Sequence, residues 1–271
     1  MAAPRPRSDP GSVLRDRSFI RALADLVLPP ACLACDGIID PRDTARLVCR
    51  RCRSLLRAVP HPGCPRCEAP RLVTARSDEA CAECRNWPDS LTVARSACLL
   101  LPPADVIVHA LKYRGWPALV SPIADRMATV RLPAAVREAA VCVPVPTTRA
   151  RLRTRGYNQA SLIAAAFASR TGRSACDVLA REGHTGTQTA LQPVARRANV
   201  AGAFRFVPER AGAVRNRGVL LIDDVLTTGA TAAACAAALA DAGALSIGLI
   251  TFARAIDARR LTQSNGAMDD R

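Results

Sequence analysis

The sequence has few aromatic residues, a single lysine and no long apolar run. Phenylalanine, tryptophan and tyrosine make up 3% of the 271 residues, and Lys112 is the one lysine. No run approaches the roughly 18 apolar residues that a membrane-spanning helix needs. The basic segment Met1–Gly11 is not followed by the continuous apolar stretch of a secretory signal. The sequence therefore predicts a cytoplasmic protein without a membrane span.

The charge is strongly positive. Lysine and arginine number 38 against 23 acidic residues, which gives a formal net charge of +15. This balance favours partners that carry phosphate, either a small molecule or nucleic acid. A general preference for arginine and alanine along the whole chain would explain the charge equally well, without any nucleic acid. The hydrophobic content of 49% excludes a disordered chain and fits one larger domain plus a small one.

Cysteine, in contrast, is abundant in the sequence. Eight of the twelve cysteines form four C-x-x-C pairs before residue 85: Cys32/Cys35, Cys49/Cys52, Cys64/Cys67 and Cys81/Cys84. Each pair can offer two thiolates to one metal, and two pairs complete a tetrahedral site, so eight ligands fit two structural zinc ions. The spacing leaves sequential and interleaved pairing open, and redox disulfides are the alternative to zinc.

The composition divides the chain into four parts. We expect a basic tail with a short helix at 1–28, a cysteine-rich zinc-binding module at 29–88, a larger domain at 89–256 and a tail at 257–271. The module has few large apolar residues, so it cannot build an ordinary core and needs metal for stability. Cys98, Cys142, Cys176 and Cys235 lie in apolar segments and are expected to be buried, inert thiols.

Beyond residue 88, strand-like and helix-like segments alternate. Strands are predicted at 91–101, 139–145, 175–180, 203–207, 218–225 and 245–252, and helices at 103–111, 117–130, 157–171 and 230–242. This alternation predicts an α/β fold in which helices cover both faces of a parallel sheet. Ligands of such sheets bind at the C-terminal ends of strands, beside helix N-termini.

One such strand end carries an unusual polar string. In VLLIDDVLTTGAT, residues 219–231, the apolar run leads directly into Asp223 and Asp224. Adjacent carboxylates can each accept a hydrogen bond from one of two vicinal hydroxyls, or contact magnesium. The loop that follows supplies hydroxyls, a flexible glycine and a helix start whose N–H groups bind phosphate. Its residues are Thr227, Thr228, Gly229, Ala230 and Thr231. Carboxylates that can bind vicinal hydroxyls, followed by a loop that can bind phosphate, are what a site for ribose 5-phosphate requires.

This string resembles the motif of type I phosphoribosyltransferases that binds 5-phosphoribosyl-1-pyrophosphate (PRPP). With the four cysteine pairs ahead of it, the chain from about Pro29 to Arg254 resembles the ComF family of phosphoribosyltransferase-like proteins. Further matching segments are LKYRG at 111–115, VPVP at 143–146, RGYNQ at 155–159 and the spaced residues Thr185, Gln188, Leu191, Arg196, Asn199, Ala203 and Phe204. The resemblance implies a parallel-sheet type I phosphoribosyltransferase fold with a small N-terminal zinc module.

The resemblance also implies roles for particular residues. Asp223 and Asp224 would hold the ribose hydroxyls as the catalytic pair, with magnesium, and the loop 227–231 would hold the 5-phosphate. Pro146, Thr147 and Arg149 would form the pyrophosphate loop, although the arginines at 149–155 could equally be a solvated basic segment. Thr187, Gln188 and Arg196 would lie in a lid that excludes water from the reacting ribosyl centre.

Two functions follow from these expectations. The first is a phosphoribosyltransferase that binds Mg-PRPP and transfers ribosyl 5-phosphate to an unknown acceptor, with release of pyrophosphate. The second is a non-catalytic protein that binds PRPP or single-stranded DNA and acts with competence or DNA-processing proteins in DNA uptake or repair. The basic charge, the zinc module and the absence of an obvious base-recognition hood favour the second function, and the family that the chain resembles is associated with DNA uptake in competent bacteria.

Overall fold

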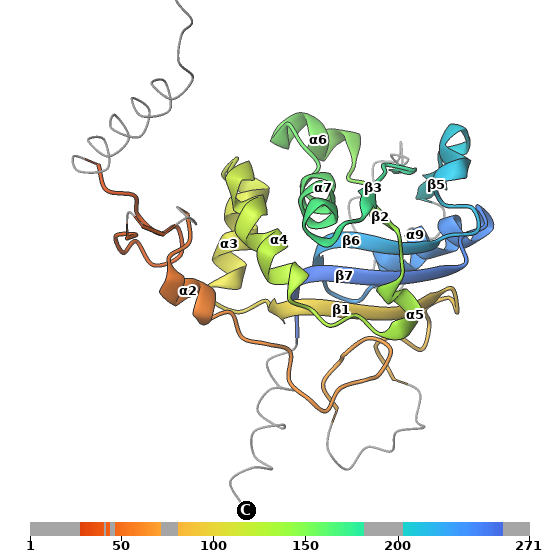
Figure 1. Cartoon of the computed structure of the whole chain (residues 1–271), viewed down its shortest axis with the longest axis horizontal. Coiled ribbons are helices and arrows are strands. Elements are labelled where there is room, and N and C mark those ends of the chain that lie inside the picture. The colour runs from red at the N-terminus through yellow and green to blue at the C-terminus, as the bar shows by residue number, and fades with distance from the viewer. Residues whose placement is uncertain (1–27, 41, 44–46, 72–80, 182–202, 257–271) are drawn as a thin grey trace, which may run out of the picture.

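The computed structural model describes residues 28–40, 42–43, 47–71, 81–181 and 203–256. Its centre is a sheet of five parallel strands in the order β1-β7-β6-β2-β3. These strands are β1 (Leu91–Leu99), β2 (Val141–Pro144), β3 (Ser174–Ala175), β6 (Gly218–Leu226) and β7 (Ser246–Arg254). Figure 1 shows the long strands β1, β7 and β6 side by side beneath the helices. The predicted α/β fold with a parallel sheet is confirmed.

The strand β6 is buried on both faces, which explains its continuous apolar sequence. Val219 and Leu221 join one hydrophobic cluster, whereas Leu220 and Ile222 join the other. Successive side chains of a strand point to opposite faces, so this alternation continues into the two acids at the strand's end. The side chain of Asp223 therefore lies on the same face of the sheet as Val219 and Leu221. That of Asp224 lies on the opposite face.

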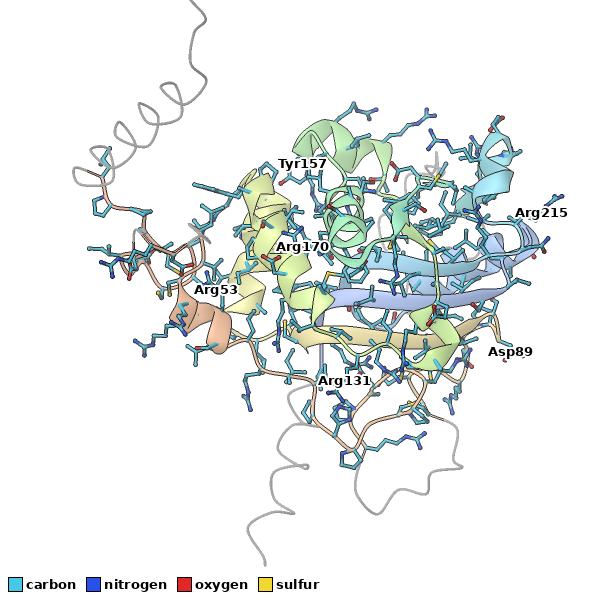
Figure 2. All side chains as sticks on the ribbon, in the orientation of Figure 1. Arg53, Asp89, Arg131, Tyr157, Arg170 and Arg215 are labelled. Carbon is cyan, nitrogen blue, oxygen red and sulfur yellow. The ribbon has the colours of Figure 1, made fainter. Side chains whose placement is uncertain are left out.

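Three helices cover one face of the sheet. They are α3 (Ala104–Tyr113), α4 (Val120–Ala128), which follows the short η1 turn (Pro117–Leu119), and α7 (Gln159–Thr171). Helices α4 and α7 are tied together by Arg170, which donates to Asp125 and to Ser121 (Figure 2). Helix α7 begins at the N-cap Asn158 and ends at Gly172 with φ of 66°, so the apolar spacing and the glycine predicted this element correctly.

Helix α9 (Ala230–Asp241) covers the opposite face, with a small antiparallel pair of strands beside it. The pair consists of β4 (Leu179–Arg181) and β5 (Phe204–Phe206). A single strand was predicted at 175–180. The structure instead ends β3 at Ala175, and the chain enters a second sheet at Leu179. The local sequence pattern does not show that the first part of this segment pairs with β2 and the last part with β5.

The structure also contains short helices that the pattern did not indicate. They are α2 (Arg50–Ser54), α5 (Ala134–Arg137), α6 (Arg149–Arg155) and the turn η2 (Pro208–Ala213). For α6 we considered a solvated basic loop, but Thr148 caps the helix by accepting from the N–H of Arg151, and Gly156 ends it with φ of 79°. The arginines are good helix formers, so a capped turn of helix forms without any apolar face.

The described residues of the cysteine-rich segment form no hydrophobic cluster of their own, in agreement with the prediction. Cys32, Ile39 and Val48 belong to the hydrophobic cluster on the α3–α4–α7 face of the sheet. Cys64, Cys67 and Trp87 belong to the cluster on the α9 face. Each half of this segment thus extends the core on a different side of the sheet. Within the described residues, no helix is both long and apolar enough to cross a membrane.

Candidate functional site

A cavity of about 550 Å³ opens at the C-terminal ends of β2 and β6. It is bounded by α3, by the segment after β2, by the start of α7 and by the loop that leads into α9. Among the residues predicted for the site, Asp223, Asp224, Thr227, Thr231, Pro146 and Thr147 line this cavity. The parallel sheet therefore brings together segments that are separated by about eighty residues in sequence, at the strand ends where ligands of such folds bind.

The two carboxylates at the end of β6 have different surroundings. Asp224 is 3% exposed, and Lys112 of α3 lies 2.7 Å from its Oδ1. The second oxygen of Asp224, Oδ2, is buried and has no hydrogen-bond partner within the described part of the chain. Asp223 accepts a hydrogen bond at 2.8 Å from the N–H of Asp224. An unpaired carboxylate oxygen in a cavity is a receptor for a hydroxyl or a cation.

Burial and the neighbouring charge of Asp224 raise the pKa of Asp223 well above the ordinary range of a carboxyl group. The N–H of Asp224 and the charges of Lys112 and Arg181 act in the opposite direction. Two adjacent carboxylates in low dielectric repel each other, so one of them holds its proton more tightly. A ligand that brings a cation or hydroxyl donors would relieve this repulsion.

The residues of the loop 227–231 line two different pockets, one on each side of the loop. Thr227 and Thr231 line the cavity, whereas Thr228 and Ala230 line a second pocket on the far side of the loop. Gly229 has φ of 74°, a conformation that other residues rarely adopt, and it is the N-cap of the twelve-residue helix α9. Because Thr231 in the first turn of α9 lines the cavity, the start of this helix lies at the edge of the cavity.

Cationic side chains also line the cavity. Arg151 and Arg155 of α6 and Arg181 of β4 are present, together with Lys112. Arg149, which we expected to contact pyrophosphate, is exposed at the first position of α6 and is not among the lining residues. Arg151 and Arg155, two and six residues further along the same helix, line the cavity instead.

Some residues of the cavity were not predicted. Asp105, His109 and Arg181 carry no recognisable sequence signal, and they reach the cavity only because α3 and β4 pack beside β6. For Lys112, the single lysine and part of the LKYRG segment, the sequence leaves both a phosphate contact and a surface helix end open, and it does not predict the contact with Asp224. The lid residues Thr187, Gln188 and Arg196 lie outside the described residues.

The eight paired cysteines form two clusters. The first cysteine cluster is Cys32, Cys35, Cys49 and Cys52, and the second cysteine cluster is Cys64, Cys67, Cys81 and Cys84. In each cluster the four sulfurs lie within 4.8 Å of one another. The pairing is therefore sequential, which the sequence had left open.

The geometry of the clusters suits zinc. The sulfur atoms are 3.8 Å apart for Cys35 and Cys49, 3.8 Å for Cys64 and Cys84, and 3.7 Å for Cys67 and Cys81. Four sulfurs placed tetrahedrally at about 2.3 Å from a zinc ion would lie about 3.8 Å apart. A disulfide would need about 2.05 Å. Sites of four thiolates leave no open coordination position, so their role is structural.

Comparison with known protein families agrees with this division of the chain. Residues 23–85 match the double zinc ribbon domain, and residues 154–265 match the phosphoribosyl transferase domain. Among solved structures, the glutamine phosphoribosylpyrophosphate amidotransferase from B. subtilis, complexed with ADP and GMP, is 19% identical over 52% of this chain, with a TM-score of 0.36. The match covers 30% of that protein's chain. A likeness this weak adds nothing to the fold assignment, which depends on the sheet and the family matches.

Three curated relatives have similar sequences. The DNA utilization protein YhgH of Escherichia coli O157:H7 is 30% identical over 196 residues, which are 68% of this chain and 80% of the relative. The competence protein ComFC of Bacillus subtilis (strain 168) is 26% identical over 82% of this chain and 94% of the relative. The competence protein F of Haemophilus influenzae is 34% identical over 40% of this chain and 44% of the relative. With its double zinc ribbon followed by a phosphoribosyltransferase domain, the chain belongs to the ComF family of these proteins.

Proposed function

We propose that the cavity binds PRPP with magnesium and that the protein transfers ribosyl 5-phosphate to an acceptor, with release of pyrophosphate. The observation that supports this function most directly is the buried oxygen Oδ2 of Asp224, which has no partner among the described residues. A buried acceptor without a donor is costly, and a ligand hydroxyl or a hydrated cation would satisfy it.

The other ends of PRPP also have counterparts in the cavity. The threonines Thr227 and Thr231, with the N-terminus of α9, would hold the 5-phosphate. Pro146 and Thr147, with Arg151 and Arg155, would hold the pyrophosphate. The diol between these groups would then lie against Asp223 and Asp224.

The chemistry that these residues can supply is positioning and charge stabilisation. The acceptor's lone pair forms a bond to C1 of the ribose, and the bond from C1 to the pyrophosphate oxygen breaks with its electrons leaving on pyrophosphate. Arg151, Arg155 and Arg181 would stabilise the charge that develops on this leaving group. Magnesium would share that charge with them, and the carboxylates suit it as oxygen ligands.

A second function has support at the rim of the cavity. Tyr113, which lines the cavity, is 66% exposed, and Trp116, three residues further along the chain, is 39% exposed, in a chain with few aromatic residues. The guanidinium of Arg155 lies 5.0 Å from the centre of the Tyr113 ring. Exposed aromatic rings beside arginines bind the bases and phosphates of single-stranded nucleic acid. The alternative is thus a non-catalytic protein that binds PRPP or single-stranded DNA and works with competence or DNA-processing proteins.

Two further expectations belong to this proposal. Eight thiols that are poised for metal suit a reducing compartment, so we place the protein in the cytoplasm. We also propose that residues 29–88 and 89–256 act as two functional units, one binding metal and one binding PRPP.

Two assays distinguish the functions. Pyrophosphate release from Mg-PRPP is measured with a panel of nucleophilic acceptors, and binding of single-stranded DNA is measured over a range of salt concentrations. Acceptor-dependent release would establish the enzyme. PRPP binding without release, combined with DNA affinity that falls steeply with salt, would establish the binding protein. If neither PRPP nor DNA binds, both functions are wrong.

A further inference from the structure

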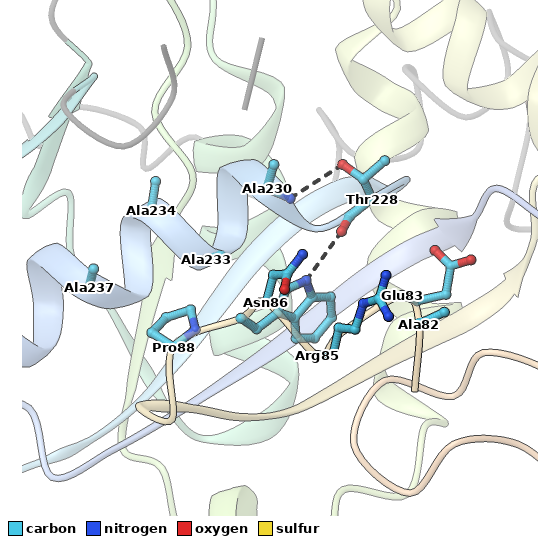
Figure 3. A pocket seen from close by; sticks show the side chains of 11 residues that line it. Ala82, Glu83, Arg85, Asn86, Pro88, Thr228, Ala230, Ala233, Ala234 and Ala237 are labelled. Atoms are coloured by element: carbon cyan, nitrogen blue, oxygen red, sulfur yellow. Dashed lines mark hydrogen bonds between the residues drawn. The ribbon is translucent and has the colours of Figure 1, made fainter. Parts of the chain in front are cut away.

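The second cysteine cluster lies directly behind the loop that is proposed to hold the 5-phosphate. Trp87 follows Cys84 by three residues and is 7% exposed. Its indole Nε1 donates a hydrogen bond to the carbonyl oxygen of Thr228 at 3.2 Å (Figure 3). The same loop faces the cavity through Thr227 and Thr231. One face of the loop thus meets the proposed ligand, while the other is held by the cysteine-rich segment.

The indole ring also supports Gly229. A Cβ placed on this glycine would lie 2.2 Å from Cζ2 of Trp87 and 2.8 Å from its Nε1. The ring therefore occupies the space where any other residue would carry its side chain. Trp87 fixes both the carbonyl before Gly229 and the path of the backbone at Gly229, and these positions decide where the N–H groups at the start of α9 point.

The position of Trp87 depends in turn on the second cysteine cluster. The N–H of Trp87 donates to the carbonyl oxygen of Cys84, and the N–H of Cys84 donates to that of Cys81. Arg66, between Cys64 and Cys67, donates to the carbonyl oxygens of Cys84, Trp87, Pro88 and Leu91. Its guanidinium lies 5.9 Å from the centre of the Trp87 ring. The two knuckles of the cluster are thereby bonded to the segment that carries Trp87.

The cluster is also anchored to the sheet on either side of this contact. Arg254 at the end of β7 is 3% exposed and donates from Nη1 to the carbonyl oxygen of Cys67. Glu68 accepts from the N–H of Ser96 in β1 at 3.0 Å and pairs with Arg95 at 3.4 Å. The cluster therefore cannot shift without moving these contacts.

The first cysteine cluster provides a natural comparison, because its contacts lie elsewhere. Its segment meets the domain through the N–H of Leu99, which donates to Arg57, and through Arg126 of α4, which donates to Leu56. Cys32 and Cys52 pack in the cluster of apolar residues on the α3–α4–α7 face. As far as the structure describes them, neither cysteine segment lines the proposed PRPP cavity itself, but the second one contacts the loop 227–231 from behind, through Trp87 and Thr228.

We propose that Trp87 is a positioning residue for the 5-phosphate loop and that metal in the second cysteine cluster, but not in the first, is required to hold that loop in its binding conformation. The inference rests on the proposed PRPP site. Zinc fits the second cluster because its sulfur spacing of 3.7–3.8 Å is that of four tetrahedral thiolates. Loss of this zinc would release Trp87 and leave Gly229 free to adopt other conformations.

The test uses two fragments of PRPP as separate probes on the full-length, zinc-loaded protein. Ribose 5-phosphate reports on the loop at 227–231, and pyrophosphate reports on the part of the cavity that Pro146, Thr147, Arg151 and Arg155 are proposed to form. Trp87→Phe keeps an aromatic ring but removes the Nε1 donor, and Cys81→Ser removes one ligand of the second cluster. Both variants are expected to weaken ribose 5-phosphate binding by about tenfold or more, the effect of one or two lost hydrogen bonds. Pyrophosphate binding should stay within about twofold of wild type.

Cys49→Ser is the matched control in the first cluster. Cys49 and Cys81 are each the first cysteine of the second pair in their cluster, and both are half-buried. Metal analysis should show one zinc ion fewer in each serine variant, while Cys49→Ser keeps the wild-type affinity for ribose 5-phosphate. Trp87→Phe should keep both zinc ions and show the binding defect alone.

Three results would overturn the inference. In the first, Trp87→Phe and Cys81→Ser bind ribose 5-phosphate as wild type does. In the second, both probes weaken equally, which is the sign of a general loss of structure. In the third, Cys49→Ser shows the same selective defect as Cys81→Ser. A wild-type protein that binds neither ribose 5-phosphate nor PRPP would instead refute the proposed function, and the inference with it.

Discussion

At the scale of single residues, the pair formed by Lys112 and Asp224 is the central feature. Asp224 is almost completely buried, and Lys112 is the charge that compensates it at Oδ1. The sequence predicted the carboxylate from its motif but left the lysine open between a phosphate contact and a surface position. It could not resolve the choice, because 111 residues separate the two and only the packing of α3 beside β6 brings them together.

Replacing Lys112 by methionine should show how much this ion pair contributes to stability. Asp224 would be left buried without a counter-charge, so the free energy of unfolding should fall by about 3 kcal/mol. In the Asp224→Asn background the same replacement should cost much less, because no charge then needs compensation. Urea denaturation of the wild type, the two single variants and the double variant measures the coupling free energy between the two side chains. Equal costs in both backgrounds would mean that the ion pair does not form.

Gly229→Ala tests the close approach of Trp87 to the loop. The alanine would hold a positive φ and place its Cβ against the indole ring. We expect a loss of stability of about 2 kcal/mol or more and PRPP binding weaker by at least about tenfold. Gly212→Ala is the control, since a Cβ there meets nothing within 4 Å. Thermal melting and calorimetry check both variants. A Gly229→Ala protein that behaves like Gly212→Ala would contradict the described loop.

At the scale of elements, sequence pattern predicted those whose apolar spacing is continuous and whose ends are marked. Strand β6 and helices α7 and α9 are examples, with boundaries within about two residues of those expected. Helix α6 was missed because its seven residues include no buried side chain. The separate paths of β3 and β4 were missed because only long-range pairing distinguishes them. The roles of the cavity residues, unlike the elements that carry them, stay predictions.

The buried strands give a prediction about thiol chemistry. Burial raises the pKa of Cys98 in β1 and of Cys142 in β2 to about 12. A thiol reacts as its thiolate, so at pH 8 these two side chains stay protonated and shielded from reagents. We expect mass spectrometry after iodoacetamide treatment of the native, zinc-loaded protein to find both unmodified. Cys176, which is half-buried, is the internal comparison and should react faster. Rapid labelling of Cys98 or Cys142 would mean that β1 or β2 opens readily.

At the scale of the whole molecule, the sheet has a hydrophobic cluster on each face, and each cluster includes one group of paired cysteines. The sequence predicted the two zinc sites and the lack of a core in their segment. It did not predict that the first site would pack on one face of the sheet and the second on the other. We therefore expect metal binding to contribute to the stability of the entire domain.

Removal of both zinc ions should therefore destabilise more than the cysteine-rich segment. Structural zinc contributes a large free energy to folding, and here its ligands share their apolar neighbours with the sheet. We expect treatment with a strong chelator to lower the melting temperature of the whole protein by about 5 °C or more. Restoring zinc should restore the transition. An unchanged main transition after complete metal loss would show that the domain is stable without the clusters.

The most direct test of the central claim is calorimetric titration of PRPP, with magnesium, into the zinc-loaded protein and its Asp224→Asn variant. Asparagine keeps the shape of the side chain but removes the negative charge of this buried residue of the cavity. Melting curves first confirm that the variant is folded. We predict saturable binding of PRPP to the wild-type protein and none to the variant at the same concentrations. Equal binding by both proteins, or no binding by the wild type at millimolar PRPP, would contradict the claim.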